Sequence, residues 1–536
     1  MKLPPGLTAQ QFAAGTQRLA EVVGQDWVLT TDEDVETYRD AYSPLRGEPE
    51  ELIPCGAVAP ESTEQVQRIV KIANDFKIPL WPISTGKNLG YGGAAPRMTG
   101  TMMLDLKRMN QVLEVNEPRA YALVEPGVSY FDFYRHLREH NLKLWLDCPD
   151  PGWGSMIGNA MDHGVGHTPM RDHFGSHCGM EVVLPNGDLL RTGTGSIPGT
   201  RGWQTFSYGY GPHISPMFGQ SNFGIVTKMG FSLLPAPEAS RNDLIGVPRH
   251  DDIHAFLDIM STLACANVVD SSWSLGSPLF MSSDPEVKAA IARSGGEPSA
   301  ELERLAAQKR LGYWGCRVRF YGAPAIIDAK WEYTKQRLSA IPGVMFEEGE
   351  YFHFPEDTDR VSEAKGDIFA KAAVGIPNLS IFSMDGAARN GGHTAFSPIV
   401  PMSGEEVLRA NKVFRAACKE LGMQWAQPGL GGWSWYKRNM VLLFIVRISE
   451  DPAQNKKMRS NIRHLIKLAA ENGWGEYRTP PIFMDDVMAA QSFNNHALLR
   501  FHETIKDALD PNGILGPGRS GIWPKRFRTL KGALRS

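Results

Sequence analysis

A glycine-rich loop between two apolar segments constrains the fold of this chain more than any other feature. The segment "PISTGKNLGYGGAAPR" covers residues 82–97 and places four glycines within eight residues. It matches neither the GxGxxG pattern that opens a Rossmann helix nor the GxxxxGK(S/T) phosphate loop. Successive backbone N–H groups can bind an anion without a helix, so the loop predicts either a pyrophosphate site or a plain tight turn. Tyr91 inside the loop is more typical of a packing residue than of a functional phenol.

The segments around this loop mix helices and strands. Ser62 and Gln65 have the spacing of a capping box, and apolar residues at helical intervals follow them. "IPLWPIS" predicts a buried strand that enters the loop, and "GMEVVLPNGDLLRTG" predicts a hairpin around Asn186-Gly187. After residue 237, amphipathic helices alternate with short strands, which indicates a second α+β domain with a boundary near Leu244.

Composition excludes several classes of protein. The 536 residues suffice for two or three domains, and 42% hydrophobic and 21% charged residues are ordinary for a globular protein. A formal net charge of -3 favours neither nucleic acid nor an anionic membrane as a partner. The N-terminus lacks a signal-peptide core, and no apolar run reaches the roughly 18 residues of a membrane span, so we expect a cytoplasmic protein. Six cysteines without close paired spacing predict reduced thiols rather than a disulfide framework or zinc site.

A second glycine-rich segment, residues 147–180, is unusually rich in histidine. Its spacings invite a metal-binding interpretation for His163, His167, His173, His177 and Cys178. Glycines and Pro169 interrupt any helix that would align the first two histidines, and no closed ligand set emerges. Loop residues that line a large cofactor are the favoured interpretation, and no metal is predicted.

Three further segments are weak when each is taken alone. His393 follows two glycines, Tyr477 stands beside Arg478, and Arg519 lies in the glycine-rich tail "DPNGILGPGRSGIW". Each has an ordinary alternative: a hydrogen-bonded histidine, a surface pair and a loose C-terminal turn.

Taken together, six segments in this order resemble the vanillyl-alcohol oxidase and 4-cresol dehydrogenase family of flavoproteins. The resemblance covers nearly the whole chain and rests on "PLWPISTGKNLGYGGAAPR", "LWLDCPDPGWGSMIGNAMDHGVGHTP", "GMEVVLPNGDLLRTG", "QSNFGIVTKMG", "NGWGEYRT" and "DPNGILGPGRSGIWP". It implies an α+β, two-domain FAD-binding fold with an α+β cap domain over the isoalloxazine. The expected division is an FAD-binding domain at 1–243, a substrate or cap domain at 244–473, and a C-terminal segment at 474–536 that returns to the FAD domain.

The resemblance implies that the chain oxidises para-substituted phenols, such as 4-alkylphenols, eugenol or vanillyl alcohol. A free phenol has a pKa of about 10, so binding it as phenolate needs donors and a cation. Tyr91, Tyr477 and Arg478 match the family's phenolate-binding residues, and the phenolate assists hydride transfer from the benzylic carbon to flavin N5, giving a p-quinone methide. Asp150 matches a carboxylate that activates water for addition to the quinone methide or accepts an alcohol proton. Its plainer alternative is a turn residue before Pro151.

The implied cofactor is FAD, attached through its 8α-methyl group to His393. The expected FAD contacts are Pro82, Ser84, Thr85, Gly86, Lys87, Asn88, Leu89, Gly90, Pro149, Gly154, Ser155, Asn159, Gly164, Gly166, His167, Gly224, Ile225, Val226, Arg478 and Arg519. The cytochrome-coupled dehydrogenases of the family attach FAD through tyrosine, and no tyrosine lies near His393 in the sequence. This favours the oxidase branch, with O2 as acceptor and H2O2 as product; the alternative is a dehydrogenase that passes electrons to a cytochrome or copper protein.

Two residues depart from the family pattern. His167 stands where many relatives have tyrosine, and Trp153 stands where the oxidases often have glycine. Both are expected near the flavin or the substrate, and Trp153 is expected to narrow the pocket. The family also implies a homodimer or a higher homo-oligomer.

Overall fold

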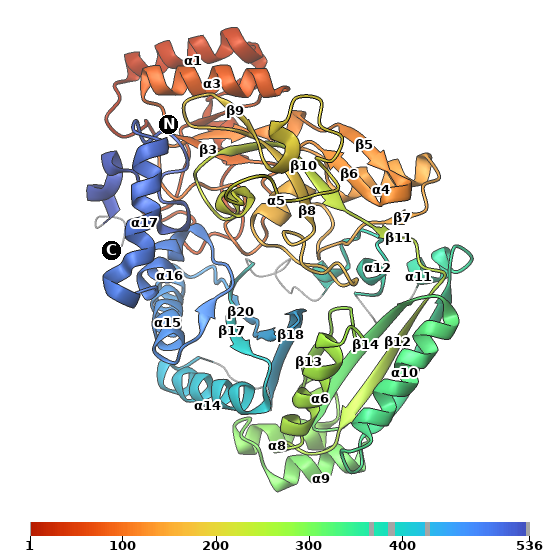
Figure 1. Ribbon diagram of the computed structural model, residues 1–536. Helices are drawn as coiled ribbons and strands as arrows, with labels where there is room; N and C mark the ends of the chain where they lie inside the picture. Colours follow the sequence, from red (N-terminus) through yellow and green to blue (C-terminus); the bar gives the residue numbers. More distant parts are fainter. Residues whose placement is uncertain (1, 364–368, 384–391, 424–428, 532–536) are drawn as a thin grey trace.

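The computed structural model describes residues 2–363, 369–383, 392–423 and 429–531. Asn390 and Gly391, which precede His393 in its motif, lie outside the described residues. In Figure 1 the chain up to β11 (Leu234–Pro235) forms one part of the molecule, and a large sheet that begins with β12 (Ala239–Val247) and receives later strands forms another. The C-terminal helices return beside the N-terminal ones, so that both ends of the chain lie on the same side.

The first part is built on a four-stranded sheet in the order β1-β2-β4-β3. Strands β2, β4 and β3 are parallel and β1 is antiparallel to β2. Two helices, α1 and α3, pack against each other at the edge of the molecule in Figure 1 and share an apolar core with this sheet. The bounds are α1 Ala9–Val23, β1 Val28–Leu29, α2 Asp32–Glu36, β2 Gly56–Val58, α3 Thr63–Phe76, β3 Leu80–Ile83 and β4 Met102–Asp105.

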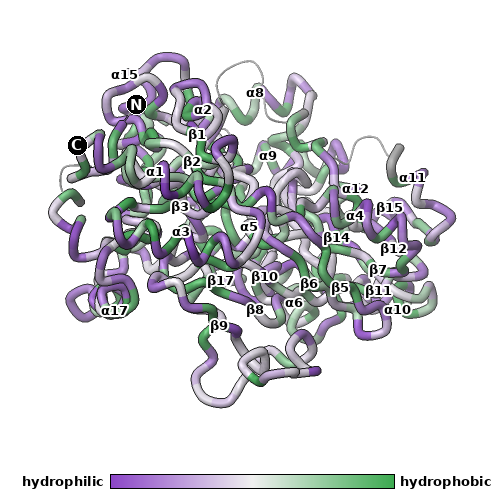
Figure 2. Tube along the Cα trace, turned by 90° about the horizontal axis from the view of Figure 1, so that it is seen from above, coloured by the Kyte–Doolittle hydropathy of each residue, from purple (hydrophilic) through white to green (hydrophobic). Residues whose placement is uncertain are grey.

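An antiparallel five-stranded sheet in the order β5-β6-β10-β8-β9 follows. Helices α4 and α5 pack on it through a second apolar core. The bounds are β5 Val112–Asn116, β6 Tyr121–Val124, α4 Tyr130–Glu139, β7 Leu144–Trp145, α5 Met156–Met161, β8 His177–Val183, β9 Leu189–Arg191, β10 Ile225–Ser232 and β11 Leu234–Pro235. Figure 2 shows the segment after β9 extending away from the rest of the chain.

The second part is an antiparallel eight-stranded sheet in the order β15-β12-β14-β13-β18-β19-β17-β21. Its strands are β12 Ala239–Val247, β13 Ser274–Gly276, β14 Trp314–Gly322, β15 Met345–His353, β17 Pro398–Pro401, β18 Leu430–Tyr436, β19 Asn439–Val441 and β21 Gly475–Glu476. A separate pair joins β16 His393–Phe396 to β20 Phe444–Arg447.

Amphipathic helices bury their apolar faces against this sheet in the largest core of the chain. They are α6 Ile253–Cys265, α7 Pro278–Met281, α8 Pro285–Ser294, α9 Ala300–Gln308, α10 Pro324–Leu338, α14 Gly404–Leu421 and α15 Pro452–Glu471, with the short α11 Thr358–Glu363 and α12 Ala370–Ala373 nearby. In Figure 2 the hydrophobic residues gather along the strands and the hydrophilic ones along the outer turns.

The C-terminal segment leads from the eight-stranded sheet back to the first part. After β21 the chain forms α16 Met484–Ala490 and α17 Phe493–Leu509, and Leu515 then bridges in parallel to Leu80 of β3. The fully buried Lys506 pairs with Asp510 at 2.8 Å and donates to the carbonyl oxygens of Asn222 and Leu515. The tail is therefore fixed beside the strand that enters the glycine loop.

Several local predictions are confirmed. The helix α3 begins after Ser62, whose hydroxyl accepts the Gln65 N–H, while the Gln65 side chain accepts the N–H of Glu61 rather than that of Ser62. The strand β3 and the hairpin β8–β9 also form as predicted. The domain division stays a prediction; the sheet pairing places the expected boundary at 243/244 inside β12, all of which belongs to the eight-stranded sheet. Across the described ranges, no helix combines the length and the apolar character that a membrane crossing requires.

Candidate active site

The glycine loop begins where β3 ends and turns sharply through positive φ angles. A Cβ on Gly92, at φ 106°, would lie 2.2 Å from Pro481, and a Cβ on Gly90, at φ 75°, would lie 2.8 Å from His393 Nε2. Glycine is needed at both positions because φ is positive and side chains from distant segments approach the backbone there. Within the described chain, the N–H groups of residues 85–88 donate to no backbone or side-chain acceptor. These unpaired donors indicate a binding surface rather than a closed turn.

A cavity opens in front of this loop, and most of the predicted FAD contacts line it. Its walls combine the loop, the segment before α5, the start of β10 and the C-terminal tail. The predicted contacts in the wall are Pro82, Ser84, Thr85, Gly86, Lys87, Asn88, Leu89, Pro149, Gly154, Ser155, Asn159, Gly224, Ile225, Val226, Arg478 and Arg519. Tyr91 and Asp150 line the same cavity.

The three phenolate-binding candidates contact one another, and two of them, Tyr91 and Arg478, line the cavity. The Arg478 guanidinium lies 3.9 Å from the centroid of the Tyr91 ring and 5.5 Å from that of the Tyr477 ring. Burial opposes a charge on Arg478, but the two phenols and Asp162 hold its pKa above the ordinary value. Burial raises the pKa of Tyr477 well above 10, so its hydroxyl remains protonated. It donates to the carbonyl oxygen of His163. Tyr477 lies behind Tyr91 and Arg478 rather than in the cavity wall.

Asp150 is paired with a histidine. His167 Nε2 lies 2.5 Å from Asp150 Oδ2, and the two side chains are 4% and 11% exposed. The imidazole packs against the rings of Phe369 and Trp433, at centroid distances of 5.3 and 5.5 Å. His167 is therefore one layer behind the cavity wall, in contact with the carboxylate that lines it.

Three predicted FAD contacts in the second glycine-rich segment do not line the cavity. A Cβ on Gly164 would lie 2.1 Å from Asn159 Oδ1, and one on Gly166 would lie 2.3 Å from Asp147 Oδ1. These glycines permit close packing beneath the cavity wall, and His167 follows them into that layer. The metal interpretation of this segment gains no support, because the described residues include no cluster of three metal-ligating side chains.

His393 and Gly90 also lie outside the cavity wall but contact each other. His393 opens β16, and its Nε2 faces Gly90 of the glycine loop. The Tyr42 ring meets the imidazole edge to face at 5.3 Å. The position is beside the loop that the sequence assigns to FAD.

Sequence reasoning missed a carboxylate in the cavity wall close to Arg478. Asp162, at the end of α5, accepts hydrogen bonds from Asn88 Nδ2 at 2.7 Å and from Arg519 Nη2 at 2.6 Å. It joins the glycine loop to the C-terminal tail across 74 and 357 sequence positions. No local sequence pattern marks Asp162 as a residue that pairs with distant segments. The sequence indicated only that its neighbourhood, "GNAMDHG", belongs to a glycine-rich segment near the cofactor.

Sequence reasoning also missed Ser397 and Glu476, which support Tyr91. The Tyr91 hydroxyl lies 3.3 Å from Ser397 Oγ, and the Ser397 N–H donates to Glu476 Oε1 at 2.7 Å. Glu476 as a residue is partly exposed, but its Oε2 is shielded from solvent and has no partner among the described residues. Burial raises the pKa of this carboxyl to about 8, although the Ser397 amide lowers it.

Aromatic side chains surround the phenol cluster. Trp433 and Trp435 stack at 5.5 Å, and Trp435 lies 5.9 Å from Tyr477. Trp153, which we expected to narrow the pocket, does not appear in the cavity wall; it packs on Phe382 at 4.9 Å and lies beneath Lys87 at 5.2 Å.

The residues present fit FAD. Unpaired loop N–H groups and Arg519 suit a pyrophosphate, and Ile225, Val226 and Ile157 supply apolar walls. Arg478 Nε is buried with no hydrogen-bond partner among the described residues, so the guanidinium keeps a donor for a bound anionic group. A Cβ on Gly154, which lines the cavity, would meet no atom within 4 Å, so there is open space in front of its backbone.

Comparison with known proteins agrees with this fit. Residues 54–193 match the FAD binding domain family, and residues 364–520 match the C-terminal domain of FAD linked oxidases. The flavoprotein subunit of a hydroxylating 4-cresol dehydrogenase from Pseudomonas putida is 32% identical over 97% of each chain. The structure of a 4-ethylphenol oxidase from Gulosibacter chungangensis, in complex with isoeugenol, superposes with a TM-score of 0.83 at 35% identity over 98% of this chain and 100% of that one. A substrate-bound p-cresol methylhydroxylase gives 0.84 at 31% identity, covering 98% and 99%.

The fold, the cavity and these matches define an FAD-dependent oxidoreductase. The chain belongs to the 4-cresol dehydrogenase and vanillyl-alcohol oxidase family of flavoproteins. The predicted α+β FAD-binding fold of this family is thereby confirmed.

Proposed function

We propose that this protein is a covalent-FAD oxidase of para-substituted phenols that returns its electrons to O2 and releases H2O2. One observation carries the proposal: a cation packed against two phenols lines the same FAD-fitting cavity as a carboxylate. Arg478, Tyr91 and Asp150 line this cavity, and Tyr477 supports them from behind. Relatives of the chain are a 4-ethylphenol oxidase and a 4-cresol dehydrogenase, which supports a phenolic substrate.

The cluster favours a substrate phenolate. The Arg478 charge, desolvated and close to two rings, is attractive to an anion because little water competes for it. The Tyr91 hydroxyl is held by Ser397 and supplies a further donor. Stacked tryptophans beside Tyr477 suit a planar ring. Together these groups lower the free energy of the phenolate relative to the phenol, and the phenolate pushes electrons toward the benzylic carbon.

FAD, when bound, accepts the hydride that leaves the benzylic carbon. Arg478 stabilises negative charge near the reacting atoms, since it retains a free donor at Nε among the described residues. Asp150 faces the cavity and serves as the base, either for water that adds to the quinone methide or for the hydroxyl of an alcohol substrate. Both tasks need an ionised carboxylate within reach of the benzylic carbon.

We assign the covalent attachment to His393. The imidazole lies against Gly90 of the loop that fits FAD, and its strand β16 is fixed by pairing with β20. His393→Ala gives the test. Wild-type protein precipitated with acid retains its yellow flavin, and the variant releases it; flavin retained by the acid-precipitated variant contradicts the assignment.

The decisive experiment is anaerobic addition of 4-ethylphenol. We expect the flavin absorbance near ~450 nm to bleach, and oxygen uptake with H2O2 formation to follow on exposure to air. Absence of bleaching contradicts a phenol-oxidising function and leaves a flavin-binding protein without this turnover.

A second candidate is a hydroxylating dehydrogenase that passes electrons to a cytochrome or copper protein. The similarity to the 4-cresol dehydrogenase subunit favours it. It predicts bleaching by the phenol and reduction of a dye, but no oxygen uptake. The homodimer and the cytoplasmic location remain predictions from the sequence, to be checked by analytical ultracentrifugation and by cell fractionation.

A further inference from the structure

The environment of Asp150 in this chain includes a histidine that the family pattern does not supply. His167 Nε2 approaches Asp150 Oδ2 to 2.5 Å. Among the described residues, His167 is the one side chain that hydrogen-bonds this carboxylate. Its other ring nitrogen, Nδ1, is buried without a described partner. The neutral tautomer with hydrogen on Nε2 satisfies this geometry best, because it leaves a lone pair rather than an N–H group unpaired at Nδ1.

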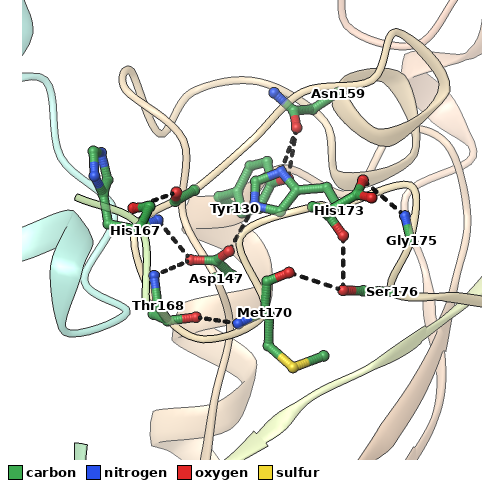
Figure 3. A network of polar contacts seen from close by, with 12 residues as sticks. Tyr130, Asp147, Asn159, His167, Thr168, Met170, His173, Gly175 and Ser176 are labelled. Atoms are coloured by element: carbon green, nitrogen blue, oxygen red, sulfur yellow. Dashed lines mark hydrogen bonds and ion pairs between the residues drawn. The ribbon is translucent and has the colours of Figure 1, made fainter. Parts of the chain in front are cut away.

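A buried network fixes the backbone that carries His167. Asp147 Oδ1 accepts the N–H groups of His167 and Thr168, each at 3.0 Å (Figure 3). His173 Nε2 lies 3.2 Å from the other oxygen of Asp147. His173 Nδ1 in turn donates to Asn159 Oδ1 at 2.5 Å, and the Tyr130 hydroxyl donates to the same oxygen at 3.3 Å.

The network leaves the imidazole of His167 directed away from it. In Figure 3 the ring points away from Asp147, which holds the backbone only. Phe369 and Trp433, whose ring centroids lie 5.1 Å apart, pack together against the imidazole. Gly166 permits this arrangement, since any side chain there would collide with Asp147. The His167 side chain is therefore held in one orientation, with its Nε2 donor directed toward Asp150.

We propose that His167 is the positioning residue for Asp150, and that its Nε2–H fixes one carboxylate oxygen so that the other addresses water at the benzylic carbon. The inference rests on the proposed phenol oxidation and names the residue that directs its water-adding step. His167 is buried behind the wall and Asp150 lies in the wall, so the histidine acts through the carboxylate.

The step balances without a further reactant. Water forms a C–O bond to the benzylic carbon of the quinone methide, and the electron pair of the exocyclic double bond moves into the ring and onto the phenolate oxygen. The water proton passes to the free oxygen of Asp150. With 4-ethylphenol the competing fate is loss of a methyl proton, which gives 4-vinylphenol instead of 1-(4-hydroxyphenyl)ethanol. The ratio of these products reports how well Asp150 directs water.

Three substitutions separate the hydrogen bond from the bulk of the side chain. His167→Phe keeps a ring but removes the donor. His167→Gln places an amide N–H at about the reach of Nε2, and His167→Asn places one short of it. His136→Phe is the matched control, because His136 lies on the outer side of α4 and stacks on His140.

We expect His167→Phe and His167→Asn to lower the ratio of alcohol to 4-vinylphenol at least tenfold. The rate of anaerobic flavin bleaching should stay within about threefold and KM within about twofold. His167→Gln should restore the ratio to within threefold of wild type, and His136→Phe should leave it unchanged. If His167→Phe does not fold, the comparison of the product ratio between His167→Gln and His167→Asn provides the test.

An unchanged ratio in His167→Phe, or a Gln variant as poor as the Asn variant, overturns the inference while wild-type bleaching sustains the proposed function. Wild-type protein that fails to bleach overturns the proposed function itself. Thermal unfolding of His167→Phe, Asp150→Asn and the double variant tests the contact without turnover. We expect a smaller effect of each substitution when the other is present; additive effects contradict the pairing.

Discussion

Two carboxylates line the same cavity and are held in opposite ways. Asp162 is bound by an amide and a guanidinium, from Asn88 and Arg519. Asp150 is bound by the imidazole of His167 on one oxygen, and no described cationic Lys or Arg side chain pairs with it. Both oxygens of Asp162 accept a hydrogen bond from a distant segment, whereas Asp150 Oδ1 has no partner among the described residues. The comparison teaches that Asp162 serves to join segments, whereas Asp150 remains available for proton transfer.

The largest expected effect is at Asp150. Asp150→Asn keeps the shape and a contact to His167 but removes the base, so we expect product formation to fall by about 10²–10⁴-fold with FAD still bound. Stopped-flow turnover and the flavin-to-protein absorbance ratio measure both quantities. If Asp150→Asn keeps its turnover within threefold of wild type, Asp150 is not the base, and the proposed difference between Asp150 and Asp162 is wrong.

The next effect concerns Tyr91. Tyr91→Phe removes the hydroxyl that meets Ser397 but keeps the ring beneath Arg478. Because a hydrogen bond to a charged partner contributes about 1.5–3 kcal/mol, we expect a 10- to 100-fold lower kcat/KM for 4-ethylphenol. FAD content should not change. Loss of FAD from the variant would instead make Tyr91 a structural residue of the loop.

Substitution of Asp162 should lower stability more than turnover, whereas substitution of Asp150 should lower turnover. Asp162→Asn weakens the link to Arg519 without removing a reacting group, so we expect the unfolding midpoint to fall by about 1–3 °C. Turnover of the holoenzyme should stay within about threefold. Differential scanning fluorimetry measures the unfolding midpoint, and steady-state kinetics measures turnover. A turnover loss as large as that of Asp150→Asn would contradict the different roles of the two carboxylates.

The effect with the least bearing on turnover is a pH dependence of stability at Glu476, a carboxyl with neither an arginine nor a histidine partner among the described residues. Burial raises its pKa from 4.5 to about 8, so between these values the folded state binds more protons than the unfolded state. Stability from this group is therefore full below about pH 4.5 and is lost as pH rises through about 8.

Glu476→Gln should remove that loss. Relative to the variant, the wild type should lose on the order of 4 kcal/mol of unfolding free energy between pH 5 and 9. Urea unfolding at several pH values measures the difference, and parallel curves for the two proteins would show that Glu476 is ionised in the folded state throughout.

The sequence by itself determined the local elements and most of the cofactor loop. Helix α3 follows from its cap and its apolar spacing, and β3 follows from a short apolar run that ends at the glycines. The resemblance to the family brought Tyr91, Asp150, Tyr477 and Arg478 forward. The tertiary structure packs Arg478 against the two tyrosine rings, beside the cavity that Asp150 also lines. These features depend on short-range periodicity or on motif order, both of which a sequence carries directly.

Only the tertiary structure decided which side chains meet. The sequence placed His167, Gly164 and Gly166 at the cofactor, whereas the fold puts them beneath the cavity wall, where close packing against Asn159 and Asp147 selects glycine. The partnership of Tyr91 with Ser397 spans 306 positions, and that of Asp162 with Arg519 spans 357. Such contacts arise when the C-terminal tail and β17 pack beside the N-terminal loop. No local pattern encodes them, because their free energy comes from burial that exists only after distant segments have met.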